Sequence, residues 1–475
     1  MIYRILFTLL LLVFSFPGWA KVYKISTAEE LKALQLVPGD KVVLRKGTWK
    51  DQKLVLKGKG TEAQPITLTV EKPGEVFLTG HSSLQLDGTW LVADGLSFKE
   101  GYSLKEDVIL FTAASENCRL TNSAIVDFDH PDRKVDYKWI SLNGIRNRVD
   151  HCYVKGKNHQ GTTLVVWLAN KPNYHRIDHN YFADRPVLGG NGGETIRIGT
   201  SNWSMHDSYT TVENNIFSKC DGELEIISNK SGHNTIRNNI FYESSGMLTL
   251  RHGNDAEVYG NYFLGNGKQG SGGVRIIGEN HKVYNNYFHG LAGTGITAAI
   301  ALMDGLPNSP LVGYFQVKRA QVVHNTIVNC AEAFSIGIGK NDQRNLPPLD
   351  CTIANNLVVV KDKLITFYDQ PVNLTISGNL VAGEQLPETI PAGMMFSPLN
   401  GQYSKEGIWQ LQSNAPTAGD PFSYVFKDIT GKDRGNKPDV GAYQLKKEPV
   451  TLLQDAIIGP KWMKLPVKRE LKIKN

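Results

Sequence analysis

Two glutamates and several basic residues occur at corresponding points of neighbouring segments of this chain. Glu223 and Glu225 are separated by a single leucine, Lys230 follows them, and Arg251 lies in the next segment. Side chains at i and i+2 of a β-strand point to one face about 7 Å apart, so both carboxylates could converge on a hard cation such as Ca²⁺. A ladder of surface salt bridges would have the same pattern. Spacing alone leaves both interpretations open.

Four short β-rich segments would have to position these residues, namely 195–198, 223–226, 247–251 and 273–276. Strand alternation predicts that one set of side chains points inward: Ile196, Ile198, Leu224, Ile226, Leu248, Leu250, Val274 and Ile276. The opposite set would share one outer surface: Arg197, Glu223, Glu225, Thr249, Arg251 and Arg275. Lys230 would lie at the edge of that surface.

A repeated phrase predicts how the segments are stacked. An apolar strand, an asparagine and a second apolar or aromatic strand recur with the asparagine at 180, 215, 239, 261, 286, 325, 356 and 379. A degenerate copy has Cys152 at this position. The spacing suits one coil of a β-solenoid, with loops inserted where it is longer. We therefore predict an all-β, single-stranded parallel β-helix whose aligned asparagines take the left-handed turn and bond to the next coil.

The two ends of the chain differ from the repeat. Residues 1–20 have the basic, apolar and small-residue order of a signal peptide, which predicts a secreted or periplasmic protein. Ser26 to Leu34 resembles a capping box that opens a short helix, which would cap the first coil. We assign 21–385 to the β-helix and 386–475 to a C-terminal extension of strands and loops packed on it. No later apolar run is long enough to span a membrane.

The amino-acid composition limits the classes of binding partner that the protein is expected to have. The net charge of +6 on an exported protein fits a polyanion, and no basic cluster interleaved with aromatics indicates nucleic acid. The five cysteines are too few for a disulfide framework and lack metal-site spacing. Nothing in the sequence indicates an oligomeric state.

Several motifs together resemble polysaccharide lyase family six, which comprises alginate lyases and chondroitinase B. They are Glu223-Leu-Glu225-Ile-Ile-Ser-Asn-Lys230-Ser, Leu250-Arg251-His252-Gly253, and the runs 191–199, 303–310, 313–317 and 439–442. The resemblance spans nearly the whole mature chain and implies a right-handed parallel β-helix. It also implies Lys230 as the Brønsted base and Arg251 as the acid. Asn191, Glu223 and Glu225, with Glu194, would hold Ca²⁺.

The implied reaction is β-elimination on an acidic polysaccharide. Removing the C5 proton of a uronate requires that its carboxylate be neutralised, by Ca²⁺ or by cationic side chains. Arg275 is the favoured substrate ligand, and the weaker candidates are His252, Arg197, His281 and Arg344. For His252 a structural role is equally open. Alginate is the expected substrate, and dermatan sulfate is the alternative.

Two other classes of protein are weighed against the lyase. A hydrolase on the same scaffold would need acidic residues on both sides of the scissile bond. The paired carboxylates here lie beside lysine and arginine, which favours elimination. A solenoid that only binds carbohydrate would keep the asparagine repeat, but would have no need for Lys230 and Arg251 beside the twin glutamates.

Overall fold

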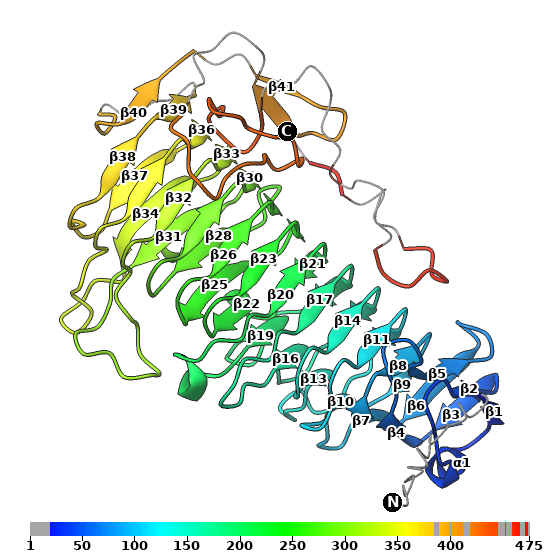
Figure 1. Cartoon of the computed structure of the whole chain (residues 1–475). Helices are drawn as coiled ribbons and strands as arrows, with labels where there is room; N and C mark the ends of the chain where they lie inside the picture. The colour runs from blue at the N-terminus through cyan, green and yellow to red at the C-terminus, as the bar shows by residue number, and fades with distance from the viewer. Residues whose placement is uncertain are drawn as a thin grey trace, which may run out of the picture.

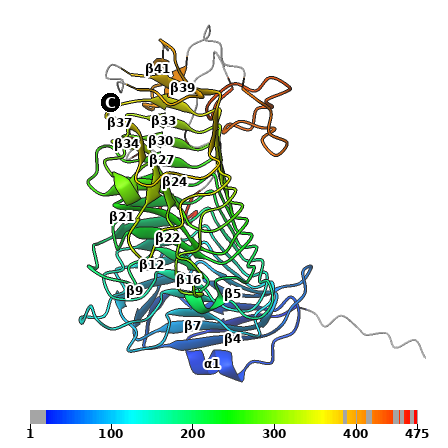
Figure 2. The same ribbon diagram turned by 90° about the vertical axis from the view of Figure 1, so that its left-hand side faces the viewer.

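The computed structural model describes residues 20–383, 389–398, 401–411, 419–444, 452, 458–465 and 471–473. Apart from Ala20, the expected signal peptide lies outside these residues. Three long parallel sheets form one solenoid, and Figures 1 and 2 show its coils stacked from the helix α1 (Ala28–Ala33) at one end to the hairpin strand β41 (Gly401–Tyr403) at the other. The predicted right-handed parallel β-helix is confirmed. Within the described residues, no helix is long and apolar enough to cross a bilayer.

Sheet 1 contains the segments that the sequence analysis singled out. Its strands, in spatial order, are β4 (Lys53–Lys59), β7 (Ser83–Thr89), β10 (Ile109–Phe111), β13 (Ile140–Leu142), β16 (Leu164–Val166), β19 (Ile196–Ile198), β22 (Glu225–Lys230), β25 (Gly246–His252), β28 (Ser271–Ile276), β31 (Ile300–Met303), β34 (Glu332–Ile338) and β37 (Lys363–Phe367). Each strand pairs in parallel with the same strand of the next coil. Residues far apart in sequence therefore lie side by side on this sheet.

Sheets 2 and 3 complete each coil. Sheet 2 contains β1 (Val22–Ile25), β2 (Lys41–Leu44), β5 (Ile66–Val70), β8 (Leu91–Asp94), β11 (Arg119–Thr121), β14 (Arg148–Asp150), β17 (Arg176–Asp178), β20 (Thr211–Glu213), β23 (Thr235–Arg237), β26 (Glu257–Tyr259), β29 (Lys282–Tyr284), β32 (Gln321–Val323), β35 (Thr352–Ala354) and β38 (Thr375–Ser377). Sheet 3 contains β3 (Gly47–Lys50), β6 (Val76–Gly80), β9 (Ser97–Gly101), β12 (Ala124–Val126), β15 (Tyr153–Lys155), β18 (Tyr181–Arg185), β21 (Ile216–Cys220), β24 (Ile240–Tyr242), β27 (Tyr262–Leu264), β30 (Tyr287–His289), β33 (Thr326–Val328), β36 (Leu357–Val359), β39 (Asn379–Ala382) and β40 (Met394–Phe396).

The repeated asparagines form a buried ladder at the corner between sheets 2 and 3. Asn239 is typical: its amide donates to Asn261 Oδ1 (3.0 Å) and to the carbonyl of Val212 (2.9 Å). Its own Oδ1 accepts from the backbone N–H of Asn215 (3.0 Å). The left-handed φ is taken by the preceding residue, for example Asn238 at 55°, and not by the ladder asparagine as predicted. The preceding residue makes the turn, and the buried asparagine joins the coils.

The solenoid interior is filled by inward-pointing apolar side chains from all three sheets. Phe217, Phe241 and Phe263 stack there with ring centroids 4.5–4.8 Å apart. All five cysteines, which lie in the described ranges, are buried and free.

The helix α1 covers the N-terminal end of the solenoid, with Leu31 packed into the core. The Thr27 side chain accepts from the N–H of Glu30, and the Glu30 carboxylate accepts from the N–H of Ser26, so the predicted capping box opens α1. At the other end, coil stacking continues to β40, beyond the predicted boundary at residue 385.

The described parts of the C-terminal extension pack along sheets 2 and 3. Trp409, in the hairpin strand β42 (Trp409–Leu411), joins Ile408 and Val440 in covering Tyr262 and Tyr287. Further along, Trp462 Nε1 donates to the carbonyl of Asn122, so the chain runs back towards the early coils (Figure 1).

Candidate active site

Two irregularities in β22 and β25 decide which side chains reach the outer surface of sheet 1. The register shifts between Glu225 and Ile227, and again between Asn229 and Lys230. As a result, Ile227 lies opposite Ile196, and Ser228 lies opposite Arg197. Such bulges re-aim side chains and are frequent beside functional sites.

The predicted inward set is correct for β19, β25 and β28, whose members Ile196, Ile198, Leu248, Leu250, Val274 and Ile276 are fully buried. It is wrong for Leu224, which is only half-buried and lines a surface cavity. The reason is that Leu224 lies in a bend before β22 begins at Glu225, so strand alternation does not extend to it, whereas Ile226 and Ile227 are both buried in the core.

The cavity, of about 480 Å³, opens on sheet 1 and brings most of the predicted site residues together. Its lining consists of Asn191, Gly192, Glu194, Arg197, Ser201, Glu223, Leu224, Glu225, Lys230, Arg251, Arg275 and Tyr314. Lys230 and Arg251 therefore face one space, beside three carboxylates.

Negative charge is concentrated on one side of this cavity. Burial, followed by the charges of Glu194 and Glu225, raises the pKa of Glu223 to about 8. Glu225 pairs with Arg275 and accepts a hydrogen bond from the hydroxyl of Ser228. Glu194 is 4% exposed and accepts from Thr162 Oγ1 at 3.0 Å. Crowded carboxylates in a buried site either bind protons, as the raised pKa of Glu223 indicates, or need compensating positive charge.

The donor types suit a hard cation, but the side chains are not closed around one. Carboxylate oxygens and the amide of Asn191 are the ligands that Ca²⁺ takes in proteins. Within the described ranges, however, no three His, Cys, Asp or Glu side chains converge on a common metal position. Because Arg275 and Ser228 engage both oxygens of Glu225, cation binding would require Glu225 to exchange a partner.

Arg251 is held by a loop from a later coil. Its guanidinium donates to the carbonyls of Gly313 (2.7 Å) and Val312 (3.2 Å) and lies 4.0 Å from the centroid of the Tyr314 ring. Burial lowers the pKa of Arg251 below its usual value. The loop thus fixes the direction of the guanidinium at the cavity wall.

His252 and Arg344 flank the cavity without lining it. His252 is 1% exposed, and its Nε2 contacts Ser201 Oγ at 3.2 Å, in the short helix η1 (Ser201–Trp203). Burial, with the charges of Arg251 and Lys230, lowers its pKa to about 3, so it is neutral. Arg344 stacks on the Tyr314 ring at 4.6 Å. Both support cavity residues in this structure.

His281 does not belong to the site, which corrects the prediction that it binds substrate. It is fully buried, its Nδ1 accepts from the N–H of Ala256 (3.1 Å), and its Nε2 donates to the carbonyl of Ile277 (2.9 Å). Asn147 and Asn234 receive the equivalent backbone bond in other coils. His281 is therefore a residue of a second internal ladder, at the corner between sheets 1 and 2.

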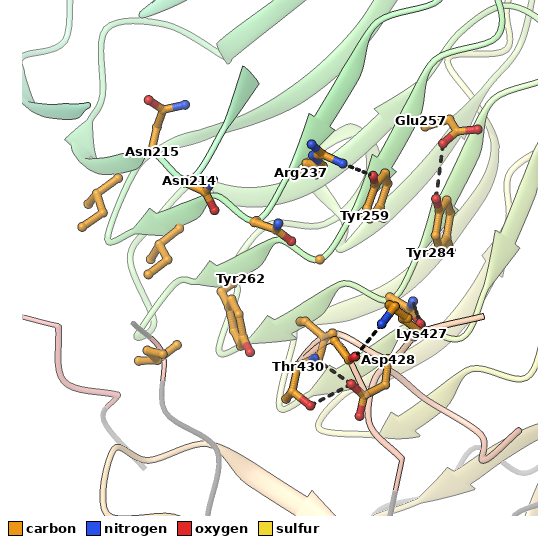
Figure 3. Close-up of a pocket in the computed structure, with 18 of the residues that line it drawn as sticks. Asn214, Asn215, Arg237, Glu257, Tyr259, Tyr262, Tyr284, Lys427, Asp428 and Thr430 are labelled. Atoms are coloured by element: carbon orange, nitrogen blue, oxygen red, sulfur yellow. Dashed lines mark hydrogen bonds between the residues drawn. The ribbon is translucent and has the colours of Figure 1, made fainter. Parts of the chain in front are cut away.

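A larger cavity, of about 670 Å³, lies between sheets 2 and 3 and the C-terminal extension (Figure 3). None of the predicted site residues lines it. Three of its charged side chains are in ion pairs, Arg237 with Glu213, Glu257 with Lys282, and Lys427 with Asp433, and the fourth, Asp428, accepts a hydrogen bond from Thr430 Oγ1. The cavity on sheet 1 is therefore the candidate active site.

Comparison with known proteins identifies the family. The family model described as chondroitinase B matches residues 25–400. The chain belongs to this family. Comparison with curated proteins finds no match.

Three solved structures are similar to this chain. It is 37% identical to the "PL6 family alginate lyase AlyGC" (TM-score 0.79), covering 90% of this chain and 59% of that one. It is 31% identical to a "mannuronic acid specific polysaccharide family 6 lyase enzyme from human gut microbiota" (TM-score 0.72; 80% and 92% covered). It is 28% identical to the "PL6 family polysaccharide lyase Pedsa3628 from Pseudopedobacter saltans" (TM-score 0.71; 93% and 100% covered). The chain thus spans only 59% of the length of the first relative.

Sequence reasoning missed Tyr314, Ser201 and Leu224 as cavity residues of this family member. Tyr314 lies in one of the quoted motif runs, 313–317, so its position carried a signal. Ser201 and Leu224 lie in a short helix and in the bend before β22, where strand alternation does not apply.

Proposed function

We propose that the protein is a lyase that cleaves the 1,4-glycosidic bonds of alginate by β-elimination, leaving a 4,5-unsaturated uronate. The observation that carries the proposal is the shared cavity of Lys230 and Arg251, with carboxylates and Arg275 on its wall. The family membership and the alginate lyases among the related structures support it.

Each residue has a role that follows from its chemistry. Lys230 Nζ takes the proton from C5, and the electron pair left on C5 is delocalised into the uronate carboxyl group. Arg251 donates a hydrogen bond to O4 and protonates it as the C4–O4 bond breaks and the C4–C5 double bond forms. No water is consumed. Arg275 and Arg197 supply positive charge near the uronate carboxylate, where charge builds up in the transition state.

We include a Ca²⁺ ion in the proposal, with Asn191, Glu194, Glu223 and Glu225 as its ligands. Bound there, it would neutralise the uronate carboxylate and so acidify the C5 proton. The crowding that raises the pKa of Glu223 supports this part of the proposal, since a cation would relieve it.

Replacing Lys230 by Ala tests the base. With alginate as substrate, we expect the ultraviolet absorbance of the unsaturated product to rise for the unmodified protein and to stay flat for K230A. Lys363→Ala removes an exposed lysine of β37 on the same sheet and should leave the rate unchanged. Release of reducing ends without a rise in absorbance would mean hydrolysis, and would contradict the proposal.

Dermatan sulfate is the second candidate substrate, because the family model that matches is chondroitinase B. The same assay with dermatan sulfate decides between the two polymers. Elimination from dermatan sulfate alone would replace alginate as the substrate but keep the roles of Lys230 and Arg251.

Chelation tests the cation. We expect incubation with a chelator to lower kcat on alginate and added Ca²⁺ to restore it, because an unneutralised uronate carboxylate opposes loss of the C5 proton. A rate that does not change on chelation would remove Ca²⁺ from the proposal and leave neutralisation to Arg275 and Arg197.

We propose further that the protein is exported to the periplasm or secreted. Residues 1–20 support this, because their order of charged, apolar and small residues is that of a cleavable signal. The N-terminal sequence of the protein recovered from the extracytoplasmic fraction tests it.

A further inference from the structure

A buried arginine lies behind the acidic side of the candidate active site. Arg185, the last residue of β18, is 3% exposed, and no carboxylate in the described part of the chain forms an ion pair with it. Its guanidinium donates to four main-chain carbonyls: Gly193 (2.6 Å), Gly192 (2.9 Å), Gly161 (3.0 Å) and Lys157 (3.2 Å). A buried cation without a direct carboxylate partner is costly to fold around. Its position therefore calls for an explanation.

The carbonyls that Arg185 holds belong to the backbone that carries the cavity residues. Gly192 and Gly193 lie between Asn191 and Glu194. Gly161 precedes Thr162, whose hydroxyl donates to the Glu194 carboxylate. Arg185 thus ties two loops of neighbouring coils together on either side of Glu194.

The same guanidinium lies where a third coil makes contact. Gly193 and Gly222 touch so closely that a Cβ on Gly222 would lie 2.1 Å from the Gly193 carbonyl oxygen and 2.6 Å from Arg185 Nε. Gly222 directly precedes Glu223. The backbone before Glu194 is therefore pressed against the backbone before Glu223, with Arg185 beside the contact.

The charge of Arg185 complements these carboxylates. Burial lowers its pKa to about 10, and the charges of Glu194 and Glu223 act in the opposite direction. The guanidinium is therefore positive at neutral pH, and the Arg185 side chain lines a small internal cavity with Phe182 and Thr195, inside the coil.

We propose that Arg185 is a positioning residue of the candidate active site, which fixes the 191–194 loop against the Glu223 segment and places a permanent positive charge behind their carboxylates. This inference rests on the proposed function of the cavity. In this proposal the Arg185 guanidinium stabilises the carboxylates of Glu194 and Glu223 from inside the coil, whereas the substrate binds on the outer surface of sheet 1.

The chain offers a matched control. Arg434 is also buried, at 2% exposed, and also clamps main-chain carbonyls, those of Asp439 (2.8 Å) and Gly441 (2.7 Å). It lies in the C-terminal extension and does not line the cavity on sheet 1. Arg185→Lys and Arg434→Lys therefore remove the same kind of clamp in two places and keep the charge in both.

We expect both variants to melt at a lower temperature, but only R185K to lose kcat, by about a hundredfold, because small displacements of groups in a reacting site cost that much. Amide hydrogen exchange should quicken in residues 188–195 and 221–224 of R185K and stay unchanged there in R434K. A merely structural role for Arg185 would lower the melting temperature of R185K without changing its kcat or this local exchange, and would overturn the inference.

A second variant serves if R185K does not fold. Gly222→Ala keeps Arg185 but forces a methyl group between it and the Gly193 carbonyl, so we expect the same local exchange and a reduced kcat. Unchanged exchange and kcat in G222A would also overturn the inference. If the unmodified protein eliminates neither alginate nor dermatan sulfate, the proposed function fails, and the exchange comparison still decides whether Arg185 orders the loop.

Discussion

At the scale of single residues, the candidate acid is defined by its neighbours as much as by its type. Arg251 donates to the carbonyls of Val312 and Gly313 and stacks on Tyr314, and its side chain lines the cavity. A fixed guanidinium loses less entropy on meeting O4 than a free one would. Its surroundings therefore favour a role in catalysis over a surface ion pair.

Tyr314 offers a test of that positioning. We expect Tyr314→Ala to lower kcat on alginate by about thirtyfold, which corresponds to the roughly 2 kcal/mol of a desolvated cation–π contact, and Tyr314→Phe to lose much less because the ring remains. Both variants are compared by steady-state kinetics. Equal losses in the two variants would assign the effect to the hydroxyl group and not to the stacking.

The site could be predicted from the sequence where strand alternation holds and not where the chain departs from it. Alternation and the motif runs brought Glu223, Lys230 and Arg251 to one surface, and the structure places them in one cavity. The two bulges in β22 are properties of the pairing between coils, so the sequence of one strand does not contain them. Strand alternation does not predict the place of His281. The residue stands as far before Asn286 as Asn234 does before Asn239, and this shared spacing is the sequence signal of the second ladder.

At the scale of elements, the coil is the unit of stability, and the asparagine ladder joins one coil to the next. Each ladder amide satisfies a backbone N–H and a carbonyl of the coil before it and donates to the asparagine of the coil after it, so three coils meet at one side chain. Inside a solenoid these buried polar groups cannot form hydrogen bonds to water, so they need partners within the protein. The recurring phrase predicted this ladder because the polar residue must recur once in every coil.

Asn239→Ala is expected to lower the free energy of unfolding by about 2–4 kcal/mol, because it leaves buried polar groups of Asn215 and Val212 unpaired. The free energy of unfolding is measured by urea titration, with circular dichroism as the signal. Asn158→Ala, at an exposed loop position, is the control and should change the unfolding free energy little. A ladder variant as stable as this control would contradict the role given to the ladder.

At the scale of the whole molecule, buried histidines make stability depend on pH. Burial lowers the pKa of His175 and His324 to about 3 and that of His281 to about 4, so the folded protein keeps them neutral. In the unfolded chain the same groups bind protons as the pH falls below about 6.5. The stability they contribute is complete above that pH and is lost as the pH falls towards 4, by up to about 1.4 kcal/mol per histidine per pH unit.

His281→Asn should reduce this loss. Asparagine occupies the equivalent position at 147 and 234, so the backbone bond from Ala256 can be kept while the titrating ring is removed. We expect the melting temperature of H281N to fall less than that of the unmodified protein between pH 7 and pH 5. His206→Asn, which removes an exposed ring, should leave the pH dependence unchanged.

The loop that holds Arg251 also fixes when the protein can become active. Gly313 follows Arg251 by 62 positions, so the guanidinium gains its orientation only after the coils between them have formed. Ordered secondary structure should therefore appear before turnover during refolding. A polypeptide truncated before residue 304 would contain Lys230, Arg251 and all three acidic side chains, but it would lack the carbonyl of Gly313 that orients Arg251.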